Sequence, residues 1–124
     1  MSEARTAKTV LIIDDDPAYR QVLTMALNAS GYRATAAENG ARALPIVSNS
    51  PPDIILLDML MPVMDGLQFL RWVKQEAKVS IPIVVLTCMD SRSVVVDALL
   101  AGATDVITKP FSLPILIRKL STLA

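Results

Sequence analysis

The chain has 124 residues, 52% of them hydrophobic, and its 12 basic and 12 acidic residues give a formal net charge of zero. This length predicts a single domain over residues 1–124, with a flexible segment at 1–7, that buries a core without metal or disulfide staples. The balanced charge disfavours direct binding to nucleic acid or to an anionic membrane, because neither surface would be attracted.

The only cysteine, Cys88, cannot form an internal disulfide, which fits a reducing compartment. The polar start at residues 1–8 does not resemble a signal peptide, and no apolar run is long enough to span a bilayer. We therefore expect a cytoplasmic location.

Strand and helix patterns alternate five times along the chain. Runs of β-branched and leucine residues predict strands at 9–13, 32–37, 53–58, 81–86 and 105–108. Apolar residues at helical spacing predict helices that begin near Pro17, Asn39, Gly66, Asp90 and Ser112. Pro45 should bend or shorten the second helix, and the third is expected to run to Ala77. This alternation predicts an α/β fold, a doubly wound parallel sheet with helices on both faces.

Polar residues end four of the strands: Asp14 and Asp15, Asp58, Thr87 and Lys109. Because the carboxyl ends of parallel strands meet at one edge of a sheet, we expect these side chains to converge there. Three crowded carboxylates repel one another unless a divalent cation lies among them, and an oxygen-only donor set suits Mg²⁺ better than zinc. A carboxylate beside Mg²⁺, an ammonium and a hydroxyl is suited to accept a phosphoryl group, so Asp58 is the candidate nucleophile.

Two other acidic residues near these strand ends have a simpler interpretation. Asp16 precedes a proline and a helical pattern, and Asp65 precedes a glycine. We interpret them as a helix cap and a turn former rather than as metal ligands.

These strand ends lie within four longer motifs: Ile12-Ile13-Asp14-Asp15, Leu57-Asp58-Met59-Leu60-Met61-Pro62-Val63-Met64-Asp65-Gly66, Leu86-Thr87 and Lys109-Pro110-Phe111. A fifth motif, Gly102-Ala103, precedes the last predicted strand. In order and spacing, over nearly the whole chain, these motifs resemble the receiver domain of two-component response regulators, as in chemotaxis-regulator-like phosphoacceptor domains. The resemblance implies a flavodoxin-like fold with five helices and strand order 2-1-3-4-5. It also implies a signalling domain rather than an enzyme, which takes a phosphoryl group from a histidine kinase or a histidine phosphotransfer protein.

By the same resemblance, Asp15 and Asp58 ligate Mg²⁺ together with the backbone carbonyl of Leu60, while Asp14 acts mainly through water. The chain departs from some relatives at Leu60 and Met89, which are apolar where those relatives place polar groups that position an attacking water. We therefore expect slow loss of the phosphoryl group from the modified protein.

Lys109 is implied to contact the phosphoryl group, and Thr87 to hydrogen-bond it and move toward it when Asp58 is modified. The peptide bond between Lys109 and Pro110 is implied to be cis. Val106 stands where the family usually carries an aromatic residue that responds to this movement. Switching is therefore expected to involve a backbone movement of the loops after the third and fourth strands.

The fourth and last predicted helices carry more apolar residues than one buried stripe needs. Val95, Leu99 and Ile115, with Val106 of the fifth strand, are candidates for an exposed face that binds a second copy or an output partner. Isolated apolar residues are also common on protein surfaces, so an ordinary surface is the alternative interpretation.

Two other functions compete with the receiver interpretation. A haloacid-dehalogenase-like phosphatase would use Asp14 as its nucleophile, with Asp16 completing an Asp-x-Asp element. An interaction module that works without phosphorylation is the second alternative. The sequence leaves open whether an output domain accompanies this domain.

Overall fold

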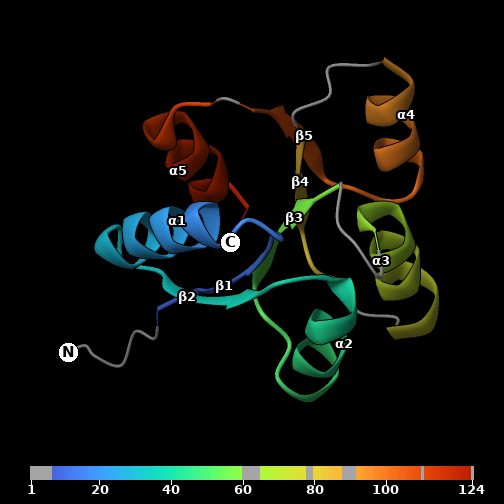
Figure 1. The fold of residues 1–124 in the computed structure, drawn as a ribbon, viewed down its shortest axis with the longest axis horizontal. Helices are drawn as coiled ribbons and strands as arrows, with labels where there is room; N and C mark the ends of the chain where they lie inside the picture. Colours follow the sequence, from blue (N-terminus) through green and yellow to red (C-terminus); the bar gives the residue numbers. More distant parts are fainter. Residues whose placement is uncertain (1–6, 60–64, 78–79, 88–91, 110, 124) are drawn as a thin grey trace.

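The computed structural model describes residues 7–59, 65–77, 80–87, 92–109 and 111–123. In this part of the chain five parallel strands form one sheet in the order β2-β1-β3-β4-β5, with helices on both faces (Figure 1). The strands are β1 (Thr9–Ile13), β2 (Arg33–Ala37), β3 (Ile54–Asp58), β4 (Ile83–Thr87) and β5 (Asp105–Thr108). The helices are α1 (Pro17–Ala29), α2 (Gly40–Asn49), α3 (Gly66–Trp72), α4 (Arg92–Leu100) and α5 (Leu113–Ser121), and a π-helical segment, η1 (Val73–Ala77), follows α3. The predicted flavodoxin-like fold is confirmed.

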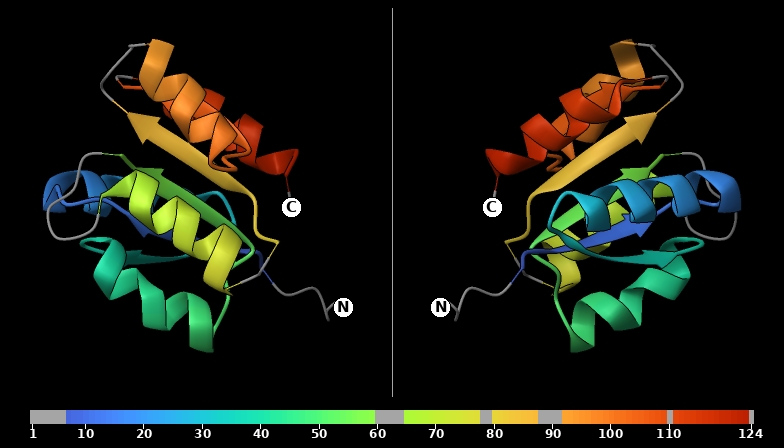
Figure 2. Two further views of the ribbon diagram at one scale, coloured as in Figure 1. Left: turned by 90° about the vertical axis from the view of Figure 1, so that its right-hand side faces the viewer. Right: turned by 90° about the vertical axis from the view of Figure 1, so that its left-hand side faces the viewer.

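The sheet separates two hydrophobic cores. Helices α1 and α5 cover one face, and α2, α3 and α4 cover the other (Figures 1 and 2). Successive residues of a strand point to opposite faces, so Val10 and Ile12 of β1 enter the core beneath α1 and α5, whereas Leu11 and Ile13 enter the other core. Every residue of β3 and β4 is buried, which explains why both strands read as unbroken apolar runs.

The strand register places the polar strand ends at one edge. Neighbouring residues at the ends of paired strands are Ile13 with Leu57, Asp58 with Leu86, and Thr87 with Thr108. Since β3 lies between β1 and β4, the end of β3 is flanked on both sides by other strand ends. Asp58 therefore occupies a central position on this edge.

Side-chain caps begin the first and third helices. The carboxylate of Asp16 accepts hydrogen bonds from the backbone N–H groups of Ala18 at 3.0 Å and Tyr19 at 3.4 Å, so its predicted capping role is confirmed. Asp65 is also a cap, not only a turn former. Its carboxylate accepts from the backbone N–H of Gln68 at 2.9 Å, while its own N–H donates to the Gln68 side chain at 3.0 Å, forming a capping box.

Pro45 does not end α2, which continues to Asn49. Proline removes one backbone hydrogen bond from a helix interior, but Ala43 and Val47 on either side of it are buried and hold the segment against the sheet. Of the predicted bend or shortening, the shortening is not observed, because tertiary packing compensates for the missing bond.

The third helix differs from the prediction of one α-helix to Ala77. It is α-helical only to Trp72 and continues as the π-helical η1, in which Val73 is buried. Strand β4 begins at Ile83 rather than at Ile81, after Pro82, which has no N–H to donate to a neighbouring strand. No helix among the described residues is long and apolar enough to cross a membrane.

Candidate functional site

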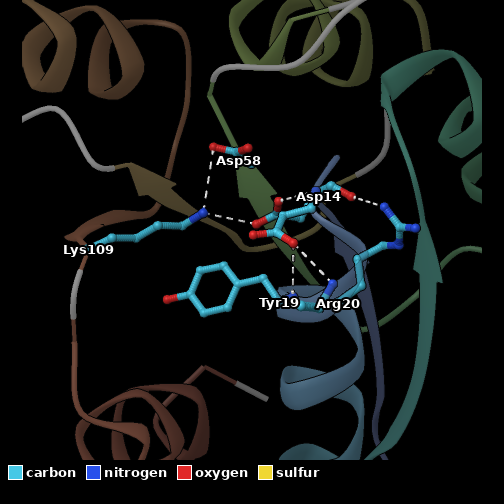
Figure 3. Close-up of polar contacts among 7 residues, drawn as sticks. Asp14, Tyr19, Arg20, Asp58 and Lys109 are labelled. Atoms are coloured by element: carbon cyan, nitrogen blue, oxygen red, sulfur yellow. Dashed lines mark hydrogen bonds and ion pairs between the residues drawn. The ribbon is translucent and has the colours of Figure 1, made fainter.

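Asp14, Asp58 and Lys109 of the predicted site meet at the carboxyl edge of the sheet (Figure 3). Asp14 and Asp15 follow β1, Asp58 ends β3, Thr87 ends β4, and Lys109 follows β5. Asp14 is 1% exposed, Asp58 7% and Thr87 0%, and these are the buried polar or charged residues in the described part of the chain. Burying a polar group without a partner costs free energy. The clustering of these three buried polar residues at one edge of the sheet therefore indicates a functional site.

Three carboxylates form the acidic part of the site. Oxygen atoms of Asp14, Asp15 and Asp58 all lie within 4.8 Å of one another, with Asp15 exposed and the other two buried. Like charges at this distance repel, and a hard divalent cation with oxygen ligands and open positions for water relieves the repulsion. The donor set therefore fits Mg²⁺. The fourth predicted ligand, the carbonyl of Leu60, lies outside the described residues.

Lys109 is the cationic part of the site. Its ammonium lies 2.9 Å from a carboxylate oxygen of Asp14 and 3.9 Å from one of Asp58, and its backbone N–H donates to the carbonyl of Thr87 at 2.7 Å. Burial alone would lower the pKa of Lys109. The hydrogen bond to Asp14 and the charges of Asp58 and Asp14 outweigh it, so the pKa is raised and the side chain stays charged. The peptide bond from Lys109 to Pro110 lies outside the described residues.

Asp14 is fixed by several groups besides Lys109. One carboxylate oxygen accepts from the backbone N–H of Asp16 at 3.0 Å, and the backbone N–H of Asp14 donates to the carbonyl of Ala37 at 3.2 Å. The guanidinium of Arg20 donates to the backbone carbonyl of Asp14 at 2.6 Å. Arg20 was not predicted from the strand ends, because it lies in the first turn of α1. Its position in the sequence gives no sign of a contact with Asp14.

Tyr19 is a second residue that the sequence reasoning missed. The ammonium of Lys109 lies 4.2 Å from the centroid of its ring, within the range of a cation–π contact. The ring also lies 6.0 Å from that of Phe111, tilted by 33°. Burial raises the pKa of Tyr19 above its ordinary value, with the charge of Lys109 opposing the shift, so the phenol is neutral.

Gly66 allows the start of α3 to lie against the backbone at the end of β3. A Cβ atom on Gly66 would lie 2.7 Å from the backbone carbonyl oxygen of Asp58 and 2.7 Å from Cα of Met59. The backbone N–H of Gly66 donates to the carbonyl of Met59 at 3.1 Å. Only glycine permits so close an approach of two backbone segments.

The predicted apolar face on α4 and α5 is confirmed in part. Leu99 is 46% and Ile115 58% exposed, as expected, whereas Val95 is only partly exposed. Because Ala98 is the buried residue of α4, the opposite side of the helix exposes Val96 and Leu100 instead. Val106 of β5 is also partly buried, against the core beneath α2, α3 and α4. We define the apolar face by Val96, Leu99, Leu100 and Ile115.

The structure has a flavodoxin-like sheet with acidic residues and a lysine at its carboxyl edge. This combination is the one expected of the receiver domain that the sequence motifs resemble. Residues 10–121 match the family model of the response regulator receiver domain. The chain belongs to this family. The match gives no support to the haloacid-dehalogenase alternative.

Curated relatives include the response regulator MprA of Mycobacterium sp. strain KMS, 40% identical over 114 residues, which are 92% of this chain and 49% of MprA. The phosphate regulon transcriptional regulatory protein PhoB of Pseudomonas aeruginosa is 40% identical over 106 residues, 85% of this chain and 46% of PhoB. The chain thus spans about half the length of the curated relatives it matches.

Solved structures agree with this assignment. The chemotaxis protein CheY4 of Vibrio cholerae superposes with a TM-score of 0.90 at 30% identity, covering 96% of this chain and 100% of CheY4. The signal receiver domain of a signal transduction histidine kinase from Syntrophus aciditrophicus gives a TM-score of 0.87 at 36% identity, covering 94% of this chain and 89% of that domain.

Proposed function

We propose that Asp58 is a phosphoacceptor, and that it takes its phosphoryl group from a phosphohistidine of a histidine kinase or of a histidine phosphotransfer protein. The observation that supports this most strongly is the place of Asp58 on the central strand β3, largely buried and 3.9 Å from the ammonium of Lys109. A carboxylate held beside a cation is ready to attack an electrophile whose negative charge the same cation offsets.

In the proposed step, an oxygen of the Asp58 carboxylate attacks phosphorus while the P–N bond of the donor breaks and its electron pair stays on the imidazole. Lys109 is close enough to contact an oxygen of a phosphoryl group on Asp58. Thr87, at the end of the adjacent β4, would donate its hydroxyl to another of those oxygens. In this proposal Asp58 is the nucleophile, and Lys109 and Thr87 bind the phosphoryl oxygens.

The proposed Mg²⁺ ligands are Asp15 and Asp58, with the backbone carbonyl of Leu60. Bound Mg²⁺ supplies positive charge that offsets both the carboxylates and the transferred phosphoryl oxygens. Asp14 is already committed to Lys109 and to the backbone N–H of Asp16, so it would act on the ion through water.

We further propose that the switch is a movement of Thr87 and of the loops after β3 and β4, of which residues 60–64 and 88–91 lie outside the described part of the chain. Val106 on β5 lacks the aromatic ring that relays this movement in relatives, so the backbone must carry it. NMR spectra with and without beryllofluoride test this, and we expect shifts around Val106 and in α4. Unchanged signals in these elements would contradict it.

Phosphorylation itself is tested with phosphoramidate as a small phosphodonor in the presence of Mg²⁺. We expect the wild type and Asp53→Asn to incorporate one phosphoryl group, and Asp58→Asn to incorporate none. Asp53 is a suitable control because its carboxylate pairs with the backbone N–H of Thr9 at the opposite end of β3. Equal labelling of Asp58→Asn and the wild type would refute the proposal.

We propose that the apolar face of Val96, Leu99, Leu100 and Ile115 receives a second copy of the chain. Beside it, Lys119 of α5 lies 2.5 Å from Asp105 of β5. A face that carries exposed apolar groups and charges of both signs can be complementary to itself across a twofold axis.

The dimer proposal is tested by analytical ultracentrifugation with and without beryllofluoride. We expect a dimer to form on beryllofluoride binding, and Leu100→Glu to prevent it. Val22→Glu, a matched change at an exposed apolar residue of α1, should leave the dimer intact. A wild type that stays monomeric in both conditions would exclude the homodimer.

A further inference from the structure

We propose that Tyr19 is a positioning residue for Lys109, and that its ring holds the ammonium beside Asp14 and Asp58. The inference rests on the proposed phosphoryl transfer to Asp58 and extends it to a residue outside the motifs that identify the family. It follows from the contact between the ring and the ammonium, from the support of that ring, and from the limited freedom of the lysine.

The contact leaves Lys109 little room to move. Its ammonium lies 2.9 Å from Asp14, 3.9 Å from Asp58 and 4.2 Å from the centre of the Tyr19 ring. Figure 3 shows the ring of Tyr19 below the lysine chain, with Asp58 above the ammonium and Asp14 beside it. The side chain of Lys109 is 17% exposed, so the ring takes the place of water on that side.

The ring is itself held in place. Tyr19 lies in the first turn of α1, where its backbone N–H donates to the capping carboxylate of Asp16 at 3.4 Å. Its ring lies 6.0 Å from the ring of Phe111, and both side chains pack against the core beneath α1 and α5. A helix start and a neighbouring aromatic thus fix the position of the ring before any donor binds.

An aromatic ring does here what an aliphatic side chain of similar size cannot. The face of a ring carries partial negative charge and attracts a cation, and the attraction is stronger where water is excluded. A lysine chain is otherwise flexible, and fixing its ammonium in advance removes an ordering cost from the transfer step. Tyr19 would therefore raise the rate of transfer without touching the phosphoryl group.

The test compares Tyr19→Leu with Tyr19→Phe, which keeps the ring and removes only the hydroxyl. We expect the maximal rate of phosphorylation by phosphoramidate to fall roughly 3- to 30-fold in Tyr19→Leu, the range that loss of a cation–π contact covers. Tyr19→Phe should retain the wild-type rate. Mg²⁺ affinity, measured by titration calorimetry, should be the same in all three proteins, because the carboxylates are unchanged.

NMR of the Lys109 side chain gives a readout that does not need phosphorylation. Protons held over a ring face are shifted upfield, and this shift should be present in the wild type and in Tyr19→Phe and lost in Tyr19→Leu. Phe111→Leu, which removes the support but not the ring, should weaken the shift and lower the rate less than Tyr19→Leu does.

Two results would overturn the inference. One is a Tyr19→Leu protein with the rate and the Lys109 signals of the wild type. The other is a Tyr19→Phe protein that loses as much as Tyr19→Leu, since the ring would then not be responsible. A wild type that takes no phosphoryl group would refute the proposed function instead, and the Lys109 signals would still decide whether Tyr19 positions the lysine.

Discussion

The ammonium of Lys109 lies 2.9 Å from Asp14 but 3.9 Å from Asp58, so in the unmodified protein the lysine is bound to the carboxylate beside the proposed phosphoacceptor. Asp14 in turn accepts a hydrogen bond from the backbone N–H of Asp16. This arrangement holds a buried carboxylate in one orientation and keeps the Lys109 ammonium within reach of a phosphoryl group on Asp58.

The first prediction concerns Asp14→Asn, which keeps the shape of the side chain and removes its charge. Because groups that act on a metal through water or hydrogen bonds typically contribute 10- to 100-fold to its affinity, we expect Mg²⁺ binding to weaken by about that factor. Titration calorimetry measures it, with Asp53→Asn as the control. Unchanged Mg²⁺ affinity would remove Asp14 from the metal site.

The second prediction concerns Gly66→Ala, in which the added Cβ would meet backbone atoms of Asp58 and Met59 at 2.7 Å. Neither backbone can yield without moving the phosphoacceptor. We expect a loss of about 1–3 kcal/mol in the free energy of unfolding by urea, together with slower phosphorylation.

Gly31→Ala is the matched control for that variant. Gly31 has a φ of +96° and nothing within 4 Å of an added Cβ, so alanine there is strained but not crowded. We expect a cost of about 1 kcal/mol and normal phosphorylation. A Gly66→Ala protein that phosphorylates as fast as Gly31→Ala would show that the close approach at Asp58 is unimportant.

The third prediction concerns the pH dependence of the Asp105 and Lys119 pair. Burial would raise the pKa of Asp105, but the hydrogen bonds from Lys119 and from the backbone N–H of Val106 outweigh it and hold the pKa below its ordinary 3.8. The pair thus stabilises the fold above this ordinary value, and the contribution is lost as the pH falls through the lowered pKa.

Carbon-13 NMR titration of Asp105 checks this. We expect its midpoint to lie below 3.8 in the wild type and to rise in Lys119→Met, since the strongest of the opposing contacts is then absent. The effect on stability is small, because both side chains are more than a third exposed. A midpoint that Lys119→Met leaves in place would contradict the assignment.

The fourth prediction concerns the lifetime of the phosphorylated protein and depends on Leu60 and Met89, which lie outside the described residues. Because Leu60 and Met89 carry no polar group that could orient an attacking water, hydrolysis should be slow. The double change Leu60→Asn with Met89→Glu should shorten the lifetime, measured as loss of radiolabel. Decay of the wild type within seconds would disprove the role of these apolar residues.

Much of the site was predictable because it depends on strand ends. Unbroken apolar runs mark buried parallel strands, and the geometry of a parallel sheet then places Asp14, Asp58, Thr87 and Lys109 on one edge whatever the details of packing. Tyr19 and Arg20 were not predictable in this way. Their contacts depend on how α1 docks against the sheet, which a helical pattern does not specify.

The exposed side of α4 and the π-helical segment after α3 were also not predictable from the sequence. The apolar residues of α4 surround much of the helix, so the pattern did not reveal that Ala98 would face inward and Leu100 outward. The π-helical η1 had no sequence signal either, since its apolar spacing also fits an α-helix. Both outcomes depend on contacts with neighbouring elements.

The most direct test of the account identifies the carboxylate that carries the phosphoryl group. The protein is labelled with phosphoramidate and Mg²⁺, the acyl phosphate is trapped by borohydride reduction, and the modified residue is located by peptide mass spectrometry. We predict reduction at Asp58 alone, and no modified peptide from Asp58→Asn. Modification at Asp14 instead of Asp58 would contradict the account and restore the haloacid-dehalogenase interpretation.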